Sequence, residues 1–166
     1  MSTIGDIPRT ADERTTLLAF LEWQRSTLAR KCEGLSPEEL RRRSVPPSTL
    51  SLLGLVRHMA DVERGWFRRT LAGEDIADRY STDDAPDGEF DNVDSADAGE
   101  AFAAWSAECE RAREIVASRT LEDEGRGKTG RVVSLRWILV HMVEEYSRHN
   151  GHADLLRQSI DGEVGY

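Results

Sequence analysis

Four long stretches of the sequence carry apolar residues at the three- and four-residue spacing of an amphipathic helix, and this pattern constrains the fold more than any other feature. No stretch shows a convincing alternation of strand-forming residues with a period of two; RVVSLRW, at 131–137, comes nearest and is short. Helices of this length, about 35 Å each, predict an all-α four-helix bundle, and the chain length predicts a single domain over 1–166. The expected helices span about 10–32, 49–72, 96–118 and 134–158.

Capping residues mark where two of the expected helices begin. Thr10 or Asp12 is placed to cap the first long helix. A short extra helix is expected in SPEELRRR, because Ser36 is a good N-cap, Pro37 takes the first helical position and Glu39 completes a capping box.

The connection between the second and third long helices is unusually long, at about 23 residues, GEDIADRYSTDDAPDGEFDNVDS. Neighbouring antiparallel helices usually need about two to eight residues, whereas this length can cross the whole bundle. We therefore expect an up-down-down-up arrangement, in which the fourth helix runs antiparallel to the second. The connection lacks the EF-hand calcium pattern, since Ala85 stands where a carboxylate or amide is needed, so we expect a solvated acidic loop.

The charge balance and the cysteine count argue against several classes of protein. The chain has 31 acidic and 22 basic side chains and a formal net charge of -9, so it repels phosphate backbones and we expect no nucleic-acid partner. No apolar run approaches the roughly 18 residues of a membrane span, and no secretory signal is visible, so neither membrane nor export is expected. Two isolated cysteines, Cys32 and Cys109, favour reduced thiols in a cytoplasmic protein.

Three of the four histidines lie in the fourth expected helix, in HMVEEYSRHNGHADLLR. At about 100° per residue, His141, Glu145, His149 and His152 point in directions within about 80° of one another, on one face of that helix. The remaining histidine, His58, shares an apolar face of the second helix. A single inward histidine is more often a satisfied core residue, but a face with three imidazoles and a carboxylate needs partners, which favours a metal site.

Helical rise limits which of these side chains can share one ion. His141 and His149 lie about 12 Å apart along the axis, too far for bonds near 2.1 Å. The pairs His141 with Glu145, Glu145 with His149, and His149 with His152 therefore stay open. His58 lies level with His149 if the fourth helix is antiparallel to the second, and level with His141 if it is parallel. The long connection favours the first case, so His58, Glu145 and His149 are the preferred metal ligands.

A set of two imidazoles and one carboxylate is typical of a catalytic metal centre, because it leaves coordination positions open for water or a substrate thiol. Zinc is the first expectation for the divalent metal ion, while nickel, iron and manganese also suit this donor set.

Two segments of the chain resemble the signature segments of the DinB-like superfamily. They are LSLLGLVRHMADVERGWF, at 50–67, and SLRWILVHMVEEYSRHNGHADLLRQSIDG, at 134–162, and they are most similar to the actinobacterial branch related to mycothiol-dependent enzymes. The resemblance includes the first helix and GLSPEELRRR, so it covers most of the chain. Members have one metal-binding histidine in the second helix and two ligands four residues apart in the fourth, the first being glutamate in the mycothiol-dependent maleylpyruvate isomerases. These positions correspond here to His58, Glu145 and His149.

The resemblance implies a four-helix bundle, often a homodimer, whose metal activates a low-molecular-weight thiol such as mycothiol or bacillithiol. A coordinated thiol is deprotonated, and the thiolate is the nucleophile. Many members have glutamine where this chain has His152, which is expected to hydrogen-bond a ligand, to act as a catalytic acid or base, or to replace Glu145 as a ligand. His141 is expected to support the site from behind or to be a core residue.

The leading hypothesis is a metal-dependent thiol S-transferase that uses mycothiol to attack a small electrophile, with detoxification as its role. The alternatives are a metal-dependent hydrolase or isomerase at the same site, and a non-enzymatic metal-binding bundle of a stress response.

Overall fold

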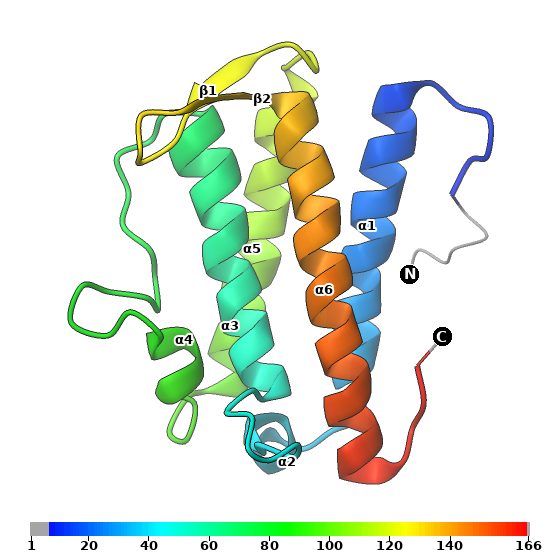
Figure 1. Ribbon diagram of the computed structural model, residues 1–166, viewed down its shortest axis with the longest axis vertical. Coiled ribbons are helices and arrows are strands. Elements are labelled where there is room, and N and C mark those ends of the chain that lie inside the picture. The colour runs from blue at the N-terminus through cyan, green and yellow to red at the C-terminus, as the bar shows by residue number, and fades with distance from the viewer. Residues whose placement is uncertain (1–6, 166) are drawn as a thin grey trace.

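A computed structural model describes residues 7–165 of the chain, so the ends of the predicted domain, 1–6 and 166, lie outside the described range. The predicted helical bundle is confirmed, with a two-stranded hairpin added at one end (Figure 1). The long helices are α1 (Glu13–Cys32), α3 (Leu52–Glu63) with its π-helical continuation η2 (Arg64–Leu71), α5 (Ala98–Ala117) and α6 (Leu135–Asp161); the short elements are α2 (Pro37–Arg41), α4 (Gly88–Asp91), β1 (Glu124–Arg126) and β2 (Val132–Ser134).

The helices begin at residues whose side chains satisfy free backbone N–H groups. Asp12, rather than Thr10, caps α1, because its carboxylate accepts a hydrogen bond from the N–H of Thr15 at 3.0 Å. The predicted capping box of α2 is present, with Ser36 and Glu39 each accepting from the other's backbone N–H.

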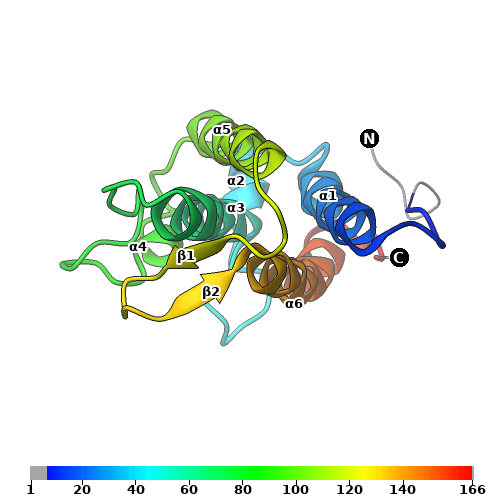
Figure 2. The ribbon, with the colours of Figure 1, turned by 90° about the horizontal axis from the view of Figure 1, so that it is seen from above.

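The helices run in two directions. In Figure 1, α1 and α6 descend while α3 and α5 ascend. Ion pairs at both ends of α1 agree with this direction, since Glu13 pairs with Arg136 near the start of α6 and Lys31 pairs with Asp154 near its end. Seen from above in Figure 2, α3 and α6 are neighbours, and the antiparallel pair they form carries all four histidines.

The hairpin was not expected from the sequence, and the expectation of no strand is wrong at 124–126 and 132–134. Each strand has only three residues, too few for an alternating pattern to show. The hairpin lies on the end of η2, where a Cβ on Gly125 would approach the carbonyl oxygen of Thr70 to 2.3 Å. Only glycine therefore allows this close contact between hairpin and helix.

The acidic connection between η2 and α5 is mostly exposed or half-buried, as expected, but it is also anchored on α3. The carboxylate of Asp61 accepts hydrogen bonds from the backbone N–H groups of Arg79, Tyr80 and Ser81 at 2.6, 2.9 and 3.0 Å. Further along, the connection forms α4, whose Glu89 is buried. The many acidic residues of this segment gave no sign that its backbone binds Asp61 or that Glu89 is buried.

A charged network lies at the centre of the bundle. Arg25 of α1 donates two hydrogen bonds to Glu63 of α3, at 2.7 and 2.6 Å. Tyr146 of α6 donates to the same carboxylate at 2.7 Å and accepts from the indole N–H of Trp105 of α5 at 2.8 Å. All four long helices thus meet at one carboxylate, which is fully buried.

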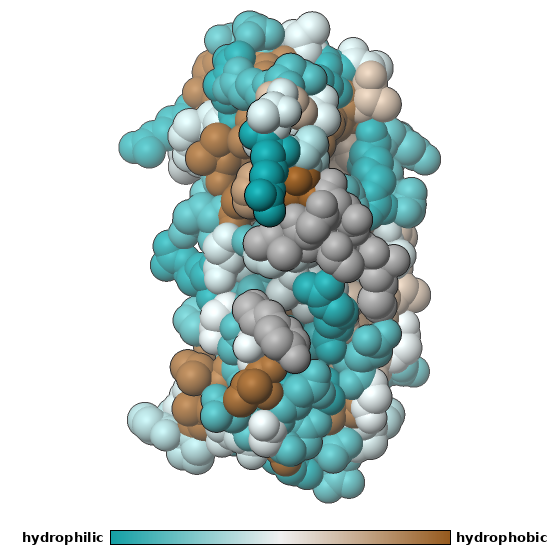
Figure 3. Space-filling model, turned by 90° about the vertical axis from the view of Figure 1, so that its right-hand side faces the viewer, coloured by the Kyte–Doolittle hydropathy of each residue, from teal (hydrophilic) through white to brown (hydrophobic). Residues whose placement is uncertain are grey.

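The outer surface is mostly polar on the side that carries α1, where apolar side chains form only small separate groups (Figure 3). Between residues 7 and 165, no helix combines the length and apolar character needed to cross a membrane. Cys32 and Cys109 are both buried free thiols, and burial raises the pKa of Cys32 to about 12.

Candidate metal centre

The structure brings together the three side chains predicted to hold a metal. His58 of α3 and Glu145 and His149 of α6 offer ligand atoms that all lie within 4.8 Å of one another. The imidazoles of His58 and His149 meet edge to face, with ring centroids 4.7 Å apart. Because α3 and α6 run antiparallel, residues 91 positions apart in the sequence share one level of the bundle.

His58 is held by residues of the acidic connection. Its Nδ1 lies 3.2 Å from Oε1 of Glu89, and its ring stacks on Phe90 with centroids 5.2 Å apart. Helices α3 and α4 approach closely at Gly54, where an added Cβ would lie only 3.0 Å from the Phe90 ring. With Nδ1 engaged by the carboxylate, Nε2 of His58 is the nitrogen left for a metal.

His149 is held in a comparable way. Its Nδ1 lies 3.3 Å from Nδ1 of His152, and its Nε2 lies 3.4 Å from Oε2 of Glu145. Burial, followed by repulsion from His58 and His152, lowers the pKa of His149 to about 4. At pH 7 this imidazole is therefore neutral and has a lone pair for a metal ion.

Glu145 lies between two histidines. Its Oε1 is 3.5 Å from Nε2 of His141, while its other oxygen faces His149. His141 also approaches Glu144 at 3.4 Å, and these two residues with Glu145 form a second group whose ligand atoms lie within 4.8 Å of one another. His141 is thus neither a core residue nor part of the first group, but a neighbour that shares Glu145 with it.

The first group fits a divalent metal. Donor atoms bound to one ion at about 2.1 Å lie at most about 4.2 Å apart. The observed limit of 4.8 Å therefore requires side-chain shifts below an ångström. Two imidazoles and a carboxylate are also the borderline nitrogen and oxygen donors that zinc, iron, nickel and manganese accept. One oxygen of Glu89, Oε2, is buried without a hydrogen-bond partner among the described residues. The carboxylate beside His58 can therefore accept a further hydrogen bond from a bound molecule.

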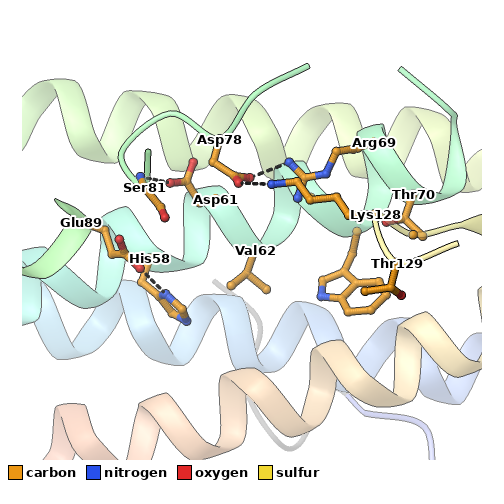
Figure 4. A pocket seen from close by; sticks show the side chains of 13 residues that line it. His58, Asp61, Val62, Arg69, Thr70, Asp78, Ser81, Glu89, Lys128 and Thr129 are labelled. Atoms are coloured by element: carbon orange, nitrogen blue, oxygen red, sulfur yellow. Dashed lines mark hydrogen bonds and ion pairs between the residues drawn. The ribbon is translucent and has the colours of Figure 1, made fainter. Parts of the chain in front are cut away.

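A cavity of about 370 Å³ opens beside His58, a volume within the usual range for small-molecule sites. Figure 4 shows His58 at one end and, at the other, Arg69 and Lys128 gathered around Asp78. The hairpin contributes Lys128, and η2 contributes Arg69. The lining comprises His58, Asp61, Val62, Gly65, Trp66, Arg69, Thr70, Asp78, Ser81, Glu89, Gly127, Lys128 and Thr129.

Sequence reasoning missed Glu89 and the polar end of the cavity. Glu89 lies 31 residues from His58 in a segment rich in carboxylates, so no spacing singles it out. Lys128 is one of two lysines in the chain, which is a weak signal, and Arg69 is one of many arginines. These residues become part of one site only through the packing of the acidic connection and the hairpin on α3 and η2.

Comparison with known proteins shows a similar fold. Two solved structures are similar: the crystal structure of the mycothiol-dependent maleylpyruvate isomerase, with a TM-score of 0.62 and 15% identity over 91% of this chain and 62% of that chain, and a histidine-to-alanine mutant of that isomerase, with a TM-score of 0.63 and 14% identity over 99% of this chain and 65% of that chain. This chain spans less than two thirds of the length of those chains, and the likeness shows a common fold. No curated protein matches the sequence.

The family model described as mycothiol-S-transferase matches residues 16–162. That range contains the three grouped ligands, His152 and every long helix except the first turn of α1. The chain therefore belongs to the mycothiol S-transferase family.

Proposed function

We propose that this protein is a metal-dependent mycothiol S-transferase, which transfers the thiol to a small electrophile. The observation that supports this most is the group of His58, Glu145 and His149 beside a cavity, in a chain of the mycothiol S-transferase family. Three nitrogen and oxygen donors leave open positions at a metal, as a catalytic centre requires.

His58, Glu145 and His149 would hold the ion, with zinc as the first candidate and nickel, iron or manganese as the others. A bound divalent ion lowers the pKa of a thiol, so that the thiol reacts as a thiolate at neutral pH. Glu89 and His152 hold the two imidazoles by their Nδ1 atoms, which keeps each Nε2 directed to one place.

In the transfer, the thiol loses its proton and its sulfur donates an electron pair to the electrophilic carbon. A new C–S bond forms, and the bond to the leaving group breaks with its electron pair. The thiol proton passes to solvent. When Nε2 of His149 holds the ion, its Nδ1–H donates to Nδ1 of His152, so neutral His152 carries its own proton on Nε2 and is proposed to donate a hydrogen bond from there to the leaving group. Loss of turnover in His152→Ala, with unchanged metal content, is the expected result; loss of the metal would instead make His152 a positioning residue or a ligand.

A thiol-assisted isomerase is the second candidate, because the solved structures similar to this chain are those of a mycothiol-dependent isomerase. In that reaction the thiol would add to a double bond and leave again after rotation, so no thiol would be consumed. Measuring thiol consumed per product therefore separates the two, with one equivalent expected for transfer and none for isomerisation.

Metal analysis and activity with variants form the central test. The purified protein should contain about one divalent ion per chain, and mycothiol should accelerate the consumption of an alkyl halide. His149→Ala should lose both the ion and the activity, whereas Glu144→Ala should keep both, because Glu144 belongs only to the second group. An ion lost from Glu144→Ala and retained by His149→Ala would place the metal in the second group and overturn the proposal. Turnover independent of mycothiol would indicate a hydrolase.

A cytoplasmic location and a homodimer complete the proposal. The buried, unpaired thiols of Cys32 and Cys109 are compatible with a reducing compartment. Light scattering of the purified protein would test the homodimer.

A further inference from the structure

Three aromatic rings lie together near His58, Glu145 and His149, which are called the metal group. The three rings belong to α6 and to η2, the continuation of α3. The ring of His141 stacks on Trp137, with centroids 5.0 Å apart and planes 22° from parallel. Trp66 meets both, at 4.8 Å from His141 and 5.1 Å from Trp137. These three residues are called the aromatic shelf.

The shelf is not hidden in the core. Trp137 is 47% exposed, although aromatic side chains bury a large apolar surface when they are covered. His141 is also partly exposed, with 22% of its side chain accessible. Trp66 packs against the hydrophobic core. The exposed indole of Trp137, by contrast, is stacked on His141 and not on the core. Exposed apolar surface of this kind commonly marks a binding site.

The shelf is continuous with the proposed reaction centre. Nε2 of His141 lies 3.5 Å from Oε1 of Glu145, one of the three grouped ligands. His141 is four residues from Glu145, or about 6 Å along α6. Trp66 lines the same cavity as His58. A planar group about the size of one benzene ring can therefore lie on the shelf while an atom bonded to it reaches the thiol site.

The charges around the shelf restrict what can bind there. The carboxylates of Glu144 and Glu145 both contact His141. Glu144, which is not among the three grouped side chains, opposes a negatively charged group on the shelf, whereas Arg69 and Lys128 of the cavity are paired with Asp78. Aromatic faces, by contrast, favour another ring in an offset or edge-to-face arrangement.

We propose that the aromatic shelf binds the planar aromatic part of an uncharged electrophile and directs the reactive carbon towards His58, Glu145 and His149. This inference rests on the proposed function and names the class of electrophile. The shelf residues select the substrate and take no part in bond making.

A matched pair of electrophiles tests the selection. Phenacyl chloride and chloroacetone carry the same chloromethyl ketone and differ only in a phenyl or a methyl group. In both, the thiolate sulfur bonds to the chloromethyl carbon and chloride leaves with the electron pair. With mycothiol and zinc-loaded protein, kcat/KM should favour phenacyl chloride after subtraction of the uncatalysed rates.

Replacing the exposed tryptophan should remove that preference. In Trp137→Ala the ratio of the two kcat/KM values should fall about tenfold, mainly through KM for phenacyl chloride. Trp137→Phe should keep most of the ratio, because a stacking ring remains. Phe20→Ala, which removes another exposed aromatic ring on α1, should leave the ratio unchanged. If Trp137→Ala leaves the ratio of the two kcat/KM values unchanged, the proposal that the shelf selects the substrate is wrong.

A binding measurement separates the shelf from the proposed chemistry. Acetophenone, which has no leaving group, should shift the indole N–H signal of Trp137 in the NMR spectrum of the zinc-loaded protein, and the spectrum of Trp137→Ala identifies that signal. If acetophenone binds there but no thiol is transferred, the shelf stands and the transferase proposal fails. If transfer occurs but acetophenone shifts no tryptophan signal, the shelf fails and the transferase proposal stands.

Discussion

Two polar clusters that share helices α3 and α6 differ in how completely the hydrogen-bonding groups within them are paired: the central network around Glu63, and the metal group of His58, Glu145 and His149. In the central network, Glu63 of α3 receives hydrogen bonds of 2.6 to 2.7 Å from Arg25 and Tyr146 and is fully buried. In the metal group, His149 and Glu145 lie 3.4 Å apart and remain 11% and 22% exposed at their side chains.

The difference follows from the donors and acceptors that each cluster contains. A guanidinium and a phenol supply N–H and O–H donors that match a carboxylate, so the network closes on itself. Two imidazoles that face one carboxylate cannot do the same, because a neutral imidazole has only one donor. The first arrangement stabilises the bundle, while the second leaves lone pairs available to a ligand.

The largest effect should come from opening the closed network. Glu63→Gln leaves Arg25 charged and buried without its buried carboxylate partner, which should reduce the free energy of unfolding by about 3–5 kcal/mol. Urea denaturation followed by circular dichroism measures this loss. The control is Glu22→Gln, whose carboxylate pairs with Arg25 near the surface and whose loss should cost about 1 kcal/mol or less. A similar loss in both variants would contradict the distinction between the clusters.

Glu89 should affect metal affinity rather than folding. Glu89→Ala removes the carboxylate that holds His58 by Nδ1, so the affinity for zinc should fall about 10- to 100-fold. Competition with a chromophoric chelator gives the dissociation constant. Asp91→Ala, an exposed carboxylate on the same short helix, should bind zinc as the wild type does. If both variants bind equally well, Glu89 does not orient the ligand.

Acid should destabilise the metal-free protein through His149. Its pKa is lowered by burial to about 4, against about 6.5 in an unfolded chain, so between these values the unfolded state binds the additional proton. Stability from this residue is therefore complete above about pH 6.5 and declines as the pH falls towards 4. Thermal melts at pH 7, 5.5 and 4.5 should show a smaller decline for His149→Gln than for the wild type; equal declines would exclude this contribution.

The smallest effect should come from an exposed pair beside the metal group. Arg148 pairs with Glu144 one turn away on α6, and exposed pairs of this kind contribute about 0.3–0.5 kcal/mol. Arg148→Ala should therefore change the midpoint of urea denaturation only slightly and leave zinc affinity unaltered. A large loss of zinc affinity would mean that Arg148 contributes to the site.

Much of the site was predictable because it depends on helical periodicity. The spacing of four between Glu145 and His149 places both on one face, and the long connection suggested the direction of α6 relative to α3, which brings His58 to their level. Helical rise predicted that His141 and His149 cannot share one ion, and in the structure His141 meets the three grouped side chains through Oε1 of Glu145. Glu89 was not predictable, because nothing in DDAPDGEFD distinguishes the one carboxylate that becomes buried.

The sequence by itself determined the helices, the capping box of the short helix and the pairing of Glu145 with His149 on one face, because these depend on local spacing and on the rise of one helix. Only the tertiary structure decided the closed network of Arg25, Glu63 and Tyr146, the support of His58 by Glu89, and the meeting of Trp66 with Trp137. These contacts join residues 31 to 83 positions apart. Such contacts depend on how whole helices and their connection pack, which no short-range pattern in the chain encodes.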